Sequence, residues 1–469
     1  MKKVISVLLV VAMLAGMLLV GGTSRGTVKH IIDEPEQTTP GDSKETDSDD
    51  ASADNVDEDT DDEPANADST DDDEASLKIG VILIGDETEG YSRSHIEGIT
   101  QAAYAIGIAQ DEIEWKERVA DSDSCYDAIS ELLDDGCNLL IANTAIYQDA
   151  MTDAANDNPD AKFVVIGGNN AALAELDNYY NAYTNIDEAY YLSGVAAGMK
   201  LKQLDRKGRI DAHGYDVAGK IRVGYIARFQ DAETISAYTA FYLGMKSVTD
   251  NVVLEVQYTN KWMDNDTEAT AADALIRSGC PLIVQNTNAT GAAETVESAW
   301  DSGRHVYYVG CEEAAMQIAP NAALTSVYSD WSVYYTKLLE AIEDGQNFEQ
   351  DWIGGLKDGA VALAAPGTYA APKTAKKLAK VSRRIRSGKL HVFDTSAYTV
   401  GGRTIGAEDA MIDLSLTDAE DEASEEDVVK SALVSYDGGA YFAESVLRSA
   451  PYFTLHVDGI RELNANEEP

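Results

Sequence analysis

The chain has 469 residues and is strongly acidic, with 82 Asp and Glu against 36 Lys and Arg and a formal net charge of −46. This length predicts two or three domains. The charge argues against nucleic acid or anionic membrane surfaces as partners of the folded part, because phosphate groups are bound by clustered cations. The 4 cysteines have no C-x-x-C spacing and the 6 histidines lie far apart. We therefore expect no metal and no other cofactor. Cys125 and Cys137 fall at opposite ends of one predicted helix, while Cys280 opens a predicted strand and Cys311 closes one, so we expect four free, mostly buried thiols.

The first 76 residues have a composition unlike that of the rest. Lys2 and Lys3 precede an apolar run at residues 4–20, so residues 1–24 are predicted to be a signal peptide or an N-terminal membrane anchor. Residues 24–76 carry 20 acids and 3 bases, and we interpret residues 25–76 as an acidic disordered linker. The protein is expected to be exported, at the cell surface or in the periplasm, and either tethered to the outer face of the cytoplasmic membrane or secreted.

From residue 77 onward, short apolar runs alternate with amphipathic stretches. Strands are predicted at 77–85, 114–120, 139–144, 163–168 and 179–185, with helices at 91–106, 124–135 and 147–158 between them. After a helix at 188–203 the rhythm repeats, with strands at 220–227, 252–258, 281–286, 305–310 and 323–328 and helices near 232–248, 267–278 and 291–302. Such alternation predicts an α/β fold of two doubly wound, parallel-sheet lobes. Ser124 and Gly136 are expected to cap the helix at 124–135.

Aromatic, amide and acidic residues follow most of the predicted strands. Ligands of parallel sheets bind at the carboxyl ends of the strands, and the candidate contacts there are Asp86, Tyr91, Ser92, Asn143, Thr144, Tyr147, Phe229, Trp262, Asn286, Thr287, Glu312, Asp330 and Trp331. Aromatic faces stack on a flat ring while amides and acids bind its polar edge. The set predicts a planar, polar-edged small molecule, although each member alone also fits a helix cap or a core residue.

Motifs for catalysis are weak. No nucleophile elbow, Walker loop or G-x-G-x-x-G follows a strand, and His95 fits a helix-surface position. The alternative is a hydrolase acting on nucleosides or envelope sugars, with Asp86, Glu87 and Glu312 as acid–base groups. Eight cations fall between residues 373 and 389; they fit a solvated helix that balances the acidic body, or a surface that docks onto an acidic partner.

Four stretches resemble one family of transport receptors: residues 190–198 (YYLSGVAAG), 259–264 (TNKWMD), 324–327 (LTSV) and 352–359 (WIGGLKDG). Over residues 78–393 the chain is similar to the basic membrane protein family of ABC-transporter substrate-binding lipoproteins. The resemblance implies the type I periplasmic-binding-protein clamp, with crossovers near Asn185, Tyr328 and Asp351. One lobe would comprise 77–185 plus about 326–350 and the other 186–325 plus about 351–395. This leaves 396–469 as an extension of uncertain role, in which a helix within 428–463 and an edge strand at 453–457 are expected.

The resemblance also implies a function. The family's ligand positions fall on Tyr91, Tyr147, Glu312 and Trp331. Ser92 and Ser329 stand where nucleoside receptors carry the Asn and Lys that bind ribose, which favours a free base, and the family's lipidated Cys is missing. We therefore expect a monomeric receptor without enzymatic activity that delivers a purine base or nucleoside to an ABC permease. A sensory module for a membrane signalling protein fits the same residues.

Overall fold

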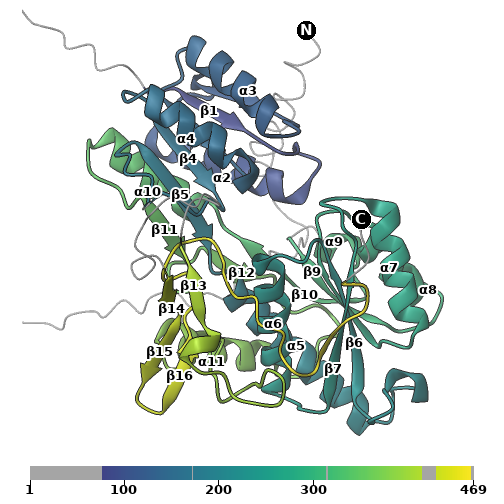
Figure 1. Ribbon diagram of the computed structural model, residues 1–469. Helices are drawn as coiled ribbons and strands as arrows, with labels where there is room; N and C mark the ends of the chain where they lie inside the picture. The colour runs from purple at the N-terminus through teal and green to yellow at the C-terminus, as the bar shows by residue number, and fades with distance from the viewer. Residues whose placement is uncertain (1–76, 172, 313–314, 415–428, 466–469) are drawn as a thin grey trace, which may run out of the picture.

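The computed structural model describes residues 77–171, 173–312, 315–414 and 429–465, which form two lobes built on parallel sheets (Figure 1). The predicted export segment, the acidic linker and the acidic run at 418–427 lie outside these residues. Within the described part of the chain, no helix is both long and apolar enough to cross a membrane. The four cysteines are free, as predicted, and only Cys311 is not fully buried.

The first lobe contains a six-stranded sheet in the order β11-β5-β4-β3-β1-β2. Its strands are β1 Ile79–Ile82, β2 Ile113–Lys116, β3 Leu139–Ala142, β4 Lys162–Ile166, β5 Tyr179–Thr184 and β11 Asp351–Gly354, and every neighbouring pair is parallel. Helices α2 Gly90–Ile106 and α10 Ser332–Glu343 cover one face, and α3 Ser122–Asp134 and α4 Gln148–Asp157 cover the other. Because both faces are covered, the central strands are continuous apolar runs.

The second lobe contains a seven-stranded sheet in the order β12-β10-β9-β8-β6-β7-β17. Its strands are β6 Ile221–Ala227, β7 Val252–Tyr258, β8 Leu282–Asn286, β9 Tyr307–Cys311, β10 Ala323–Ser329, β12 Val361–Leu363 and β17 Ile460–Glu462; only β12 runs antiparallel to its neighbour. Helices α5 Ile186–Arg206, α6 Ala232–Lys246 and α11 Thr374–Arg386 cover one face, and α7 Asn265–Arg277, α8 Gly291–Asp301 and α9 Ala315–Ile318 the other.

Glycines allow α5 and α6 to pack with their backbones nearly in contact. A Cβ added at Gly194 would lie 2.0 Å from the Phe241 carbonyl oxygen, and one at Gly244 would lie 1.9 Å from the Tyr191 carbonyl oxygen. Any side chain at either position would force the helices apart. This contact explains Gly194, the first glycine of the YYLSGVAAG stretch.

Three crossings join the lobes. They lie at Asn185 between β5 and α5, at residues 330–331 between β10 and α10, and at residues 355–360 between β11 and β12. The third had been expected near Asp351, but β11 pairs with β5 and so belongs to the first sheet, while β10 lies wholly in the second. The third crossing is bonded to the first turn of α5, since the backbone N–H of Leu356 donates to the Glu188 carboxylate at 2.6 Å.

The C-terminal extension packs on the second lobe beside α5 and α6 and is drawn in yellow in Figure 1. It contains two hairpins, β13 Met411–Asp413 with β14 Val429–Ser431 and β15 Leu433–Tyr436 with β16 Gly439–Phe442, before β17 joins β7. The sequence suggested a helix and an edge strand at 453–457. Residues 429–465 contain no helix, and the edge strand is β17. Single 3-10 turns complete the fold at Gln110–Glu112, Ala145–Tyr147, Ala212–Gly214 and Ala407–Asp409.

Candidate functional site: a cavity between the lobes

A cavity of about 560 Å³, measured to its opening, lies between the lobes at the carboxyl ends of their strands. The lining residues are Tyr91, Tyr183, Thr184, Ile186, Tyr190, Arg228, Glu233, Trp262, Asn286, Asn288, Cys311, Glu312, Ser329 and Trp331. Five of the predicted contacts are therefore brought together: Tyr91, Trp262, Asn286, Glu312 and Trp331.

Tyr91 forms the first-lobe wall at the start of α2. The Glu89 carboxylate caps this helix by accepting the backbone N–H groups of Tyr91 at 2.8 Å and Ser92 at 2.6 Å. The Tyr91 hydroxyl donates to the carbonyl of Asn143 at 2.7 Å. Both ends of the residue are thus fixed, so its ring is held in place before any ligand arrives.

His95 lies behind this wall and is fully buried, so the prediction of a surface position is wrong. Its ring contacts the Tyr91 ring edge-on at 4.6 Å between centroids and stacks on Trp331 at 4.5 Å. Helix α10 packs against α2, and His95 Nδ1 lies 2.7 Å from the Tyr335 hydroxyl. Burial lowers the pKa of His95 to about 3, so the ring is neutral. The neutral ring packs between Tyr91 and Trp331 and contacts both.

The second-lobe wall consists of Trp262 and Arg228. The Arg228 guanidinium lies over the Trp262 ring, 4.7 Å from its centroid, and forms an ion pair with Glu233. Burial opposes the charge on Arg228, but Glu233 and Asp231 keep its pKa above the ordinary range. A permanently charged guanidinium is therefore held inside the cavity.

Three buried donors on this side of the cavity have no hydrogen-bond partner among the described residues. They are Arg228 Nε, Trp262 Nε1 and Asn288 Nδ2. A buried donor without a partner costs about 1–3 kcal/mol, and native proteins contain few such groups. The site therefore offers three unused N–H groups to an acceptor-bearing ligand.

The two walls touch across the cavity. The Tyr91 and Trp262 rings lie 5.6 Å apart at an interplanar angle of 81°. Behind them, a Cβ added at Gly90 would lie 3.1 Å from Glu312 Cγ. Glu312 has a positive φ of 61° and is fixed by its N–H bond to the Val327 carbonyl at 2.8 Å. The lobes are therefore closed. To stack a flat ring between them, the faces of Tyr91 and Trp262 would have to lie parallel and about 7 Å apart, which is twice the optimal carbon–carbon contact distance.

Tyr147 does not reach the cavity, which corrects the sequence-based placement. Its side chain is fully buried in the first-lobe core, and its hydroxyl donates to the Val119 carbonyl at 2.6 Å. The 3-10 turn at Ala145–Tyr147 directs the chain back under the sheet before α4 begins.

Asn143 and Ser92 are buried and position the wall from behind. Asn143 Oδ1 accepts the N–H of Ile84 at 3.0 Å, and its amide donates to Ser92 Oγ at 3.2 Å. Ser92 Oγ also accepts the N–H of Gly85 at 3.1 Å. Both side chains use their hydrogen-bonding groups to join the ends of β1 and β3 to α2.

The remaining predicted contacts lie outside the cavity lining. Asp86 pairs with Arg118 and accepts the Thr88 hydroxyl, while Asp330 accepts the N–H and hydroxyl of Ser332. Phe229 is 38% exposed and Thr287 is buried, but neither lines the cavity, and Thr144 precedes the 3-10 turn. In each case the residue does follow a strand, but local turn bonds or the direction of the chain take its side chain elsewhere.

Several lining residues were missed by the sequence analysis. The most informative are Arg228, Glu233, Tyr183, Tyr190 and Asn288. Arg228 directly follows β6, and Tyr183 is the second-to-last residue of β5, so a strand-end rule that also includes the last two residues of each strand finds both. Tyr190 lies in α5, which the strand-end rule does not consider.

Comparison with known proteins identifies the family of this chain. The family described as "ABC transporter substrate-binding protein PnrA-like", Bmp, matches residues 78–396. The chain belongs to the Bmp family. The match includes both sheets except β17 and ends where the C-terminal extension begins.

Relatives of this Bmp protein carry different ligand names. A purine-binding protein of Brucella abortus is 30% identical over 68% of this chain and 84% of its own length. A putative ABC transporter glucose-binding protein of Haloferax volcanii is 28% identical over 66% of this chain and 72% of its own. Among solved structures, an ABC transporter solute-binding protein from Conexibacter woesei has a TM-score of 0.55 at 19% identity, covering 67% of this chain and 98% of that one. The last comparison supports the type I periplasmic-binding-protein fold, as predicted.

Proposed function

We propose that this chain is the extracytoplasmic receptor of an ABC importer for a purine base or nucleoside, which it binds between its lobes and releases unchanged to a permease. Family membership supports the transport role, and one relative bears the name of a purine-binding protein. The lobes would open and close about their three crossings, as hinged two-domain receptors do.

The observation that carries the ligand proposal is the combination of rings from both lobes with unpartnered buried donors. Tyr91 and Trp262 supply rings from opposite walls, which touch edge-on in the closed structure and would separate to stack on a flat ligand. Arg228 Nε, Trp262 Nε1 and Asn288 Nδ2 need acceptors, which the carbonyl oxygen and bare ring nitrogens of an oxopurine provide. Arginine recognises guanine through the same pair of acceptors, O6 and N7. We therefore favour an oxopurine such as hypoxanthine or guanine over adenine, whose amino group is a donor.

A free base fits the cavity better than a nucleoside. Thr184 and Ser329 line the cavity, and their hydroxyl oxygens lie 2.8 Å apart in a hydrogen bond. Ser329 stands where the resemblance places the ribose-binding lysine of nucleoside receptors. Two hydroxyls that satisfy one another offer less to a ribose than a lysine does.

Two of the three acids in the hydrolase alternative lie outside the cavity lining. Asp86 is bound to Arg118 and Glu87 is exposed, and neither lines the cavity; of the three, only Glu312 does. Incubation with inosine followed by chromatography separates the two functions, because a receptor returns the nucleoside intact.

Isothermal titration calorimetry tests which ligand the protein binds. The protein is first freed of co-purified ligand and then titrated with hypoxanthine, guanine, adenine, inosine and glucose, the last because a relative is named a glucose-binding protein. The proposal expects micromolar or tighter binding of an oxopurine, which corresponds to about −8 kcal/mol. Binding of glucose with no response to any purine would refute it.

A further inference from the structure

A second surface of the molecule is basic in an otherwise acidic protein. An open groove of about 810 Å³ lies between the C-terminal half of α5 and the start of α11. Its lining is Met199, Lys202, Gln203, Arg206, Lys207, Val248, Ala371, Pro372 and Lys377. Four of these residues are cations and none is an acid.

The cations of this groove have no acidic partner in the described part of the chain. Arg206, Lys207 and Lys377 take part in no ion pair between described residues, and Lys202 donates to the Val248 carbonyl at 2.7 Å. The sequence of α11 contains no Asp or Glu. Asp205, the nearest acid along α5, accepts the Tyr215 hydroxyl at 2.7 Å.

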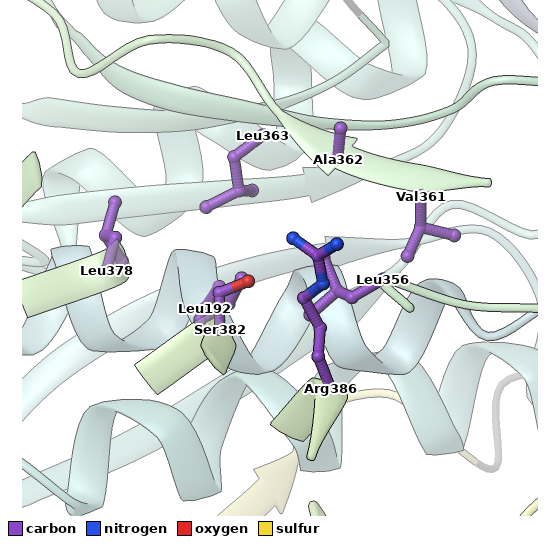
Figure 2. Close-up of a pocket in the computed structure, with 8 residues that line it drawn as sticks. All are labelled: Leu192, Leu356, Val361, Ala362, Leu363, Leu378, Ser382 and Arg386. Atoms are coloured by element: carbon purple, nitrogen blue, oxygen red, sulfur yellow. The ribbon is translucent and has the colours of Figure 1, made fainter. Parts of the chain in front are cut away.

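Helix α11 presents this charge because its apolar side is used for packing. Leu378, Val381 and Ile385 are buried against the second-lobe core. Figure 2 shows the inner side of the helix, where Arg386 extends over a cavity of about 420 Å³ toward Leu356 and Val361. Of the basic residues of α11, Lys377 in the first turn lines the groove.

We propose that this groove binds the chain's own acidic segment, residues 45–76. That segment has 16 acids and no base, so its charge is complementary to the groove. Its 32 residues can span about 105 Å when extended, at 3.3 Å each. A folded body of this size has a radius of gyration of about 21 Å, so the segment can reach α11 although β1 and α11 lie at opposite ends of Figure 1.

The physical attachment of the segment favours it over other anionic occupants. A tethered ligand acts at an effective concentration of roughly millimolar. An anionic lipid surface, by contrast, must approach a protein whose net charge is −46, and it is repelled at low ionic strength. An intramolecular contact of exposed charges is screened as salt rises, because the Debye length falls from about 10 Å at 0.1 M to 3 Å at 1 M.

Carbodiimide cross-linking of the full chain tests the proposal, because the reagent joins carboxylates to lysines at direct contact. At low salt, mass spectrometry is expected to find residues 45–74 joined to Lys202, Lys207 or Lys377. Arg206→Glu is expected to reduce these cross-links about threefold to tenfold, the range that one or two exposed ion pairs provide, without removing a reactive lysine. The matched control is Arg277→Glu, since Arg206 and Arg277 are each the last residue of a second-lobe helix.

Two results would overturn the proposal. One is a low-salt pattern in which the acidic segment joins lysines over the whole surface. The other is a pattern that Arg206→Glu and Arg277→Glu change equally. Sedimentation of the full chain with phosphatidylglycerol vesicles supplies the competing outcome: pelleting that Arg206→Glu abolishes, without groove cross-links, would assign the groove to a membrane and also refute the intramolecular contact.

Discussion

Replacing Arg228 with lysine is the sharpest test of the ligand site. Arg228 is 6% exposed, lies over Trp262 and pairs with Glu233, and its Nε has no partner among the described residues. Lysine keeps the positive charge beside Glu233 but lacks the planar fork that binds two acceptors at once. The substitution therefore removes the proposed donor to the oxopurine while retaining most of the local electrostatics.

The expected loss follows from the strength of one hydrogen bond to a charged group, about 1.5–3 kcal/mol. At 1.4 kcal/mol per tenfold, the dissociation constant for hypoxanthine should rise about 10- to 150-fold. Adenine binding should change less. Adenine carries an amino group in place of the carbonyl oxygen, and an amino group does not accept a hydrogen bond from Arg228. Stability should change little, since the side chain of Glu233 is 34% exposed and can be hydrated after the substitution.

Arg222→Lys is the matched control. Arg222 lies at the opposite end of the same strand, β6, and its guanidinium binds Glu255 through Nε at 3.0 Å and a terminal nitrogen at 2.8 Å. It is equally an arginine–glutamate pair, but it does not line the cavity. Calorimetry on both variants should show weak hypoxanthine binding only for Arg228→Lys. Affinity within twofold of wild type for Arg228→Lys, or an equal loss in Arg222→Lys, would remove the guanidinium from the proposed recognition.

Three further outcomes are expected. Trp262→Phe keeps a ring but removes the unpartnered indole N–H, so calorimetry should show roughly fivefold to thirtyfold weaker oxopurine binding, about 1–2 kcal/mol; unchanged affinity would mean that this N–H faces no acceptor. Burial raises the pKa of Glu444 to about 7, so this group makes the folded state less stable as pH rises from about 4.5 through 7. Urea unfolding from pH 5 to 8 should show wild type losing up to about 3 kcal/mol relative to Glu444→Gln, whereas parallel pH profiles would contradict the buried, protonated carboxyl. Gly244→Ala places a Cβ 1.9 Å from the Tyr191 carbonyl oxygen and should lower the melting temperature by several degrees or more; an unchanged melting temperature would show that α5 and α6 are less closely packed than this.

The architecture could be predicted because its signals are local and repeated. Each covered parallel strand is a short apolar run, and each connecting helix shows its own amphipathic pattern, so both sheets follow from the sequence. Exact helix ends were less predictable. Gly136 has the expected positive φ of 85°, but Asp121 rather than Ser124 caps α3 by accepting the Ser124 N–H at 2.9 Å. Both residues are good caps, and only the direction of the incoming chain decides between them.

The position of the cavity could be predicted from the sequence, but the full set of residues that line it could not. Parallel strands end at one edge, which correctly placed Tyr91, Trp262 and Trp331 along a single cavity. The strand-end rule does not take account of the turn that follows each strand. After β3, that turn places the Tyr147 side chain in the core. His95 was misplaced for a different reason. Helix α10, some 240 residues further along the chain, covers it, and no local pattern encodes that contact.

The closed, ring-to-ring contact between the walls has a consequence for how specificity arises. A ligand that enters must replace the Tyr91–Trp262 contact, worth about 0.5–1.5 kcal/mol, with two stacking contacts of about 1–3 kcal/mol each. The net gain from stacking is thus a few kcal/mol and is nearly the same for any flat heterocycle. Micromolar affinity needs about 8 kcal/mol, so most of the remainder must come from polar groups such as Arg228 and Asn288. In this site the rings therefore select for flatness, while the unpartnered donors decide which flat molecule is bound.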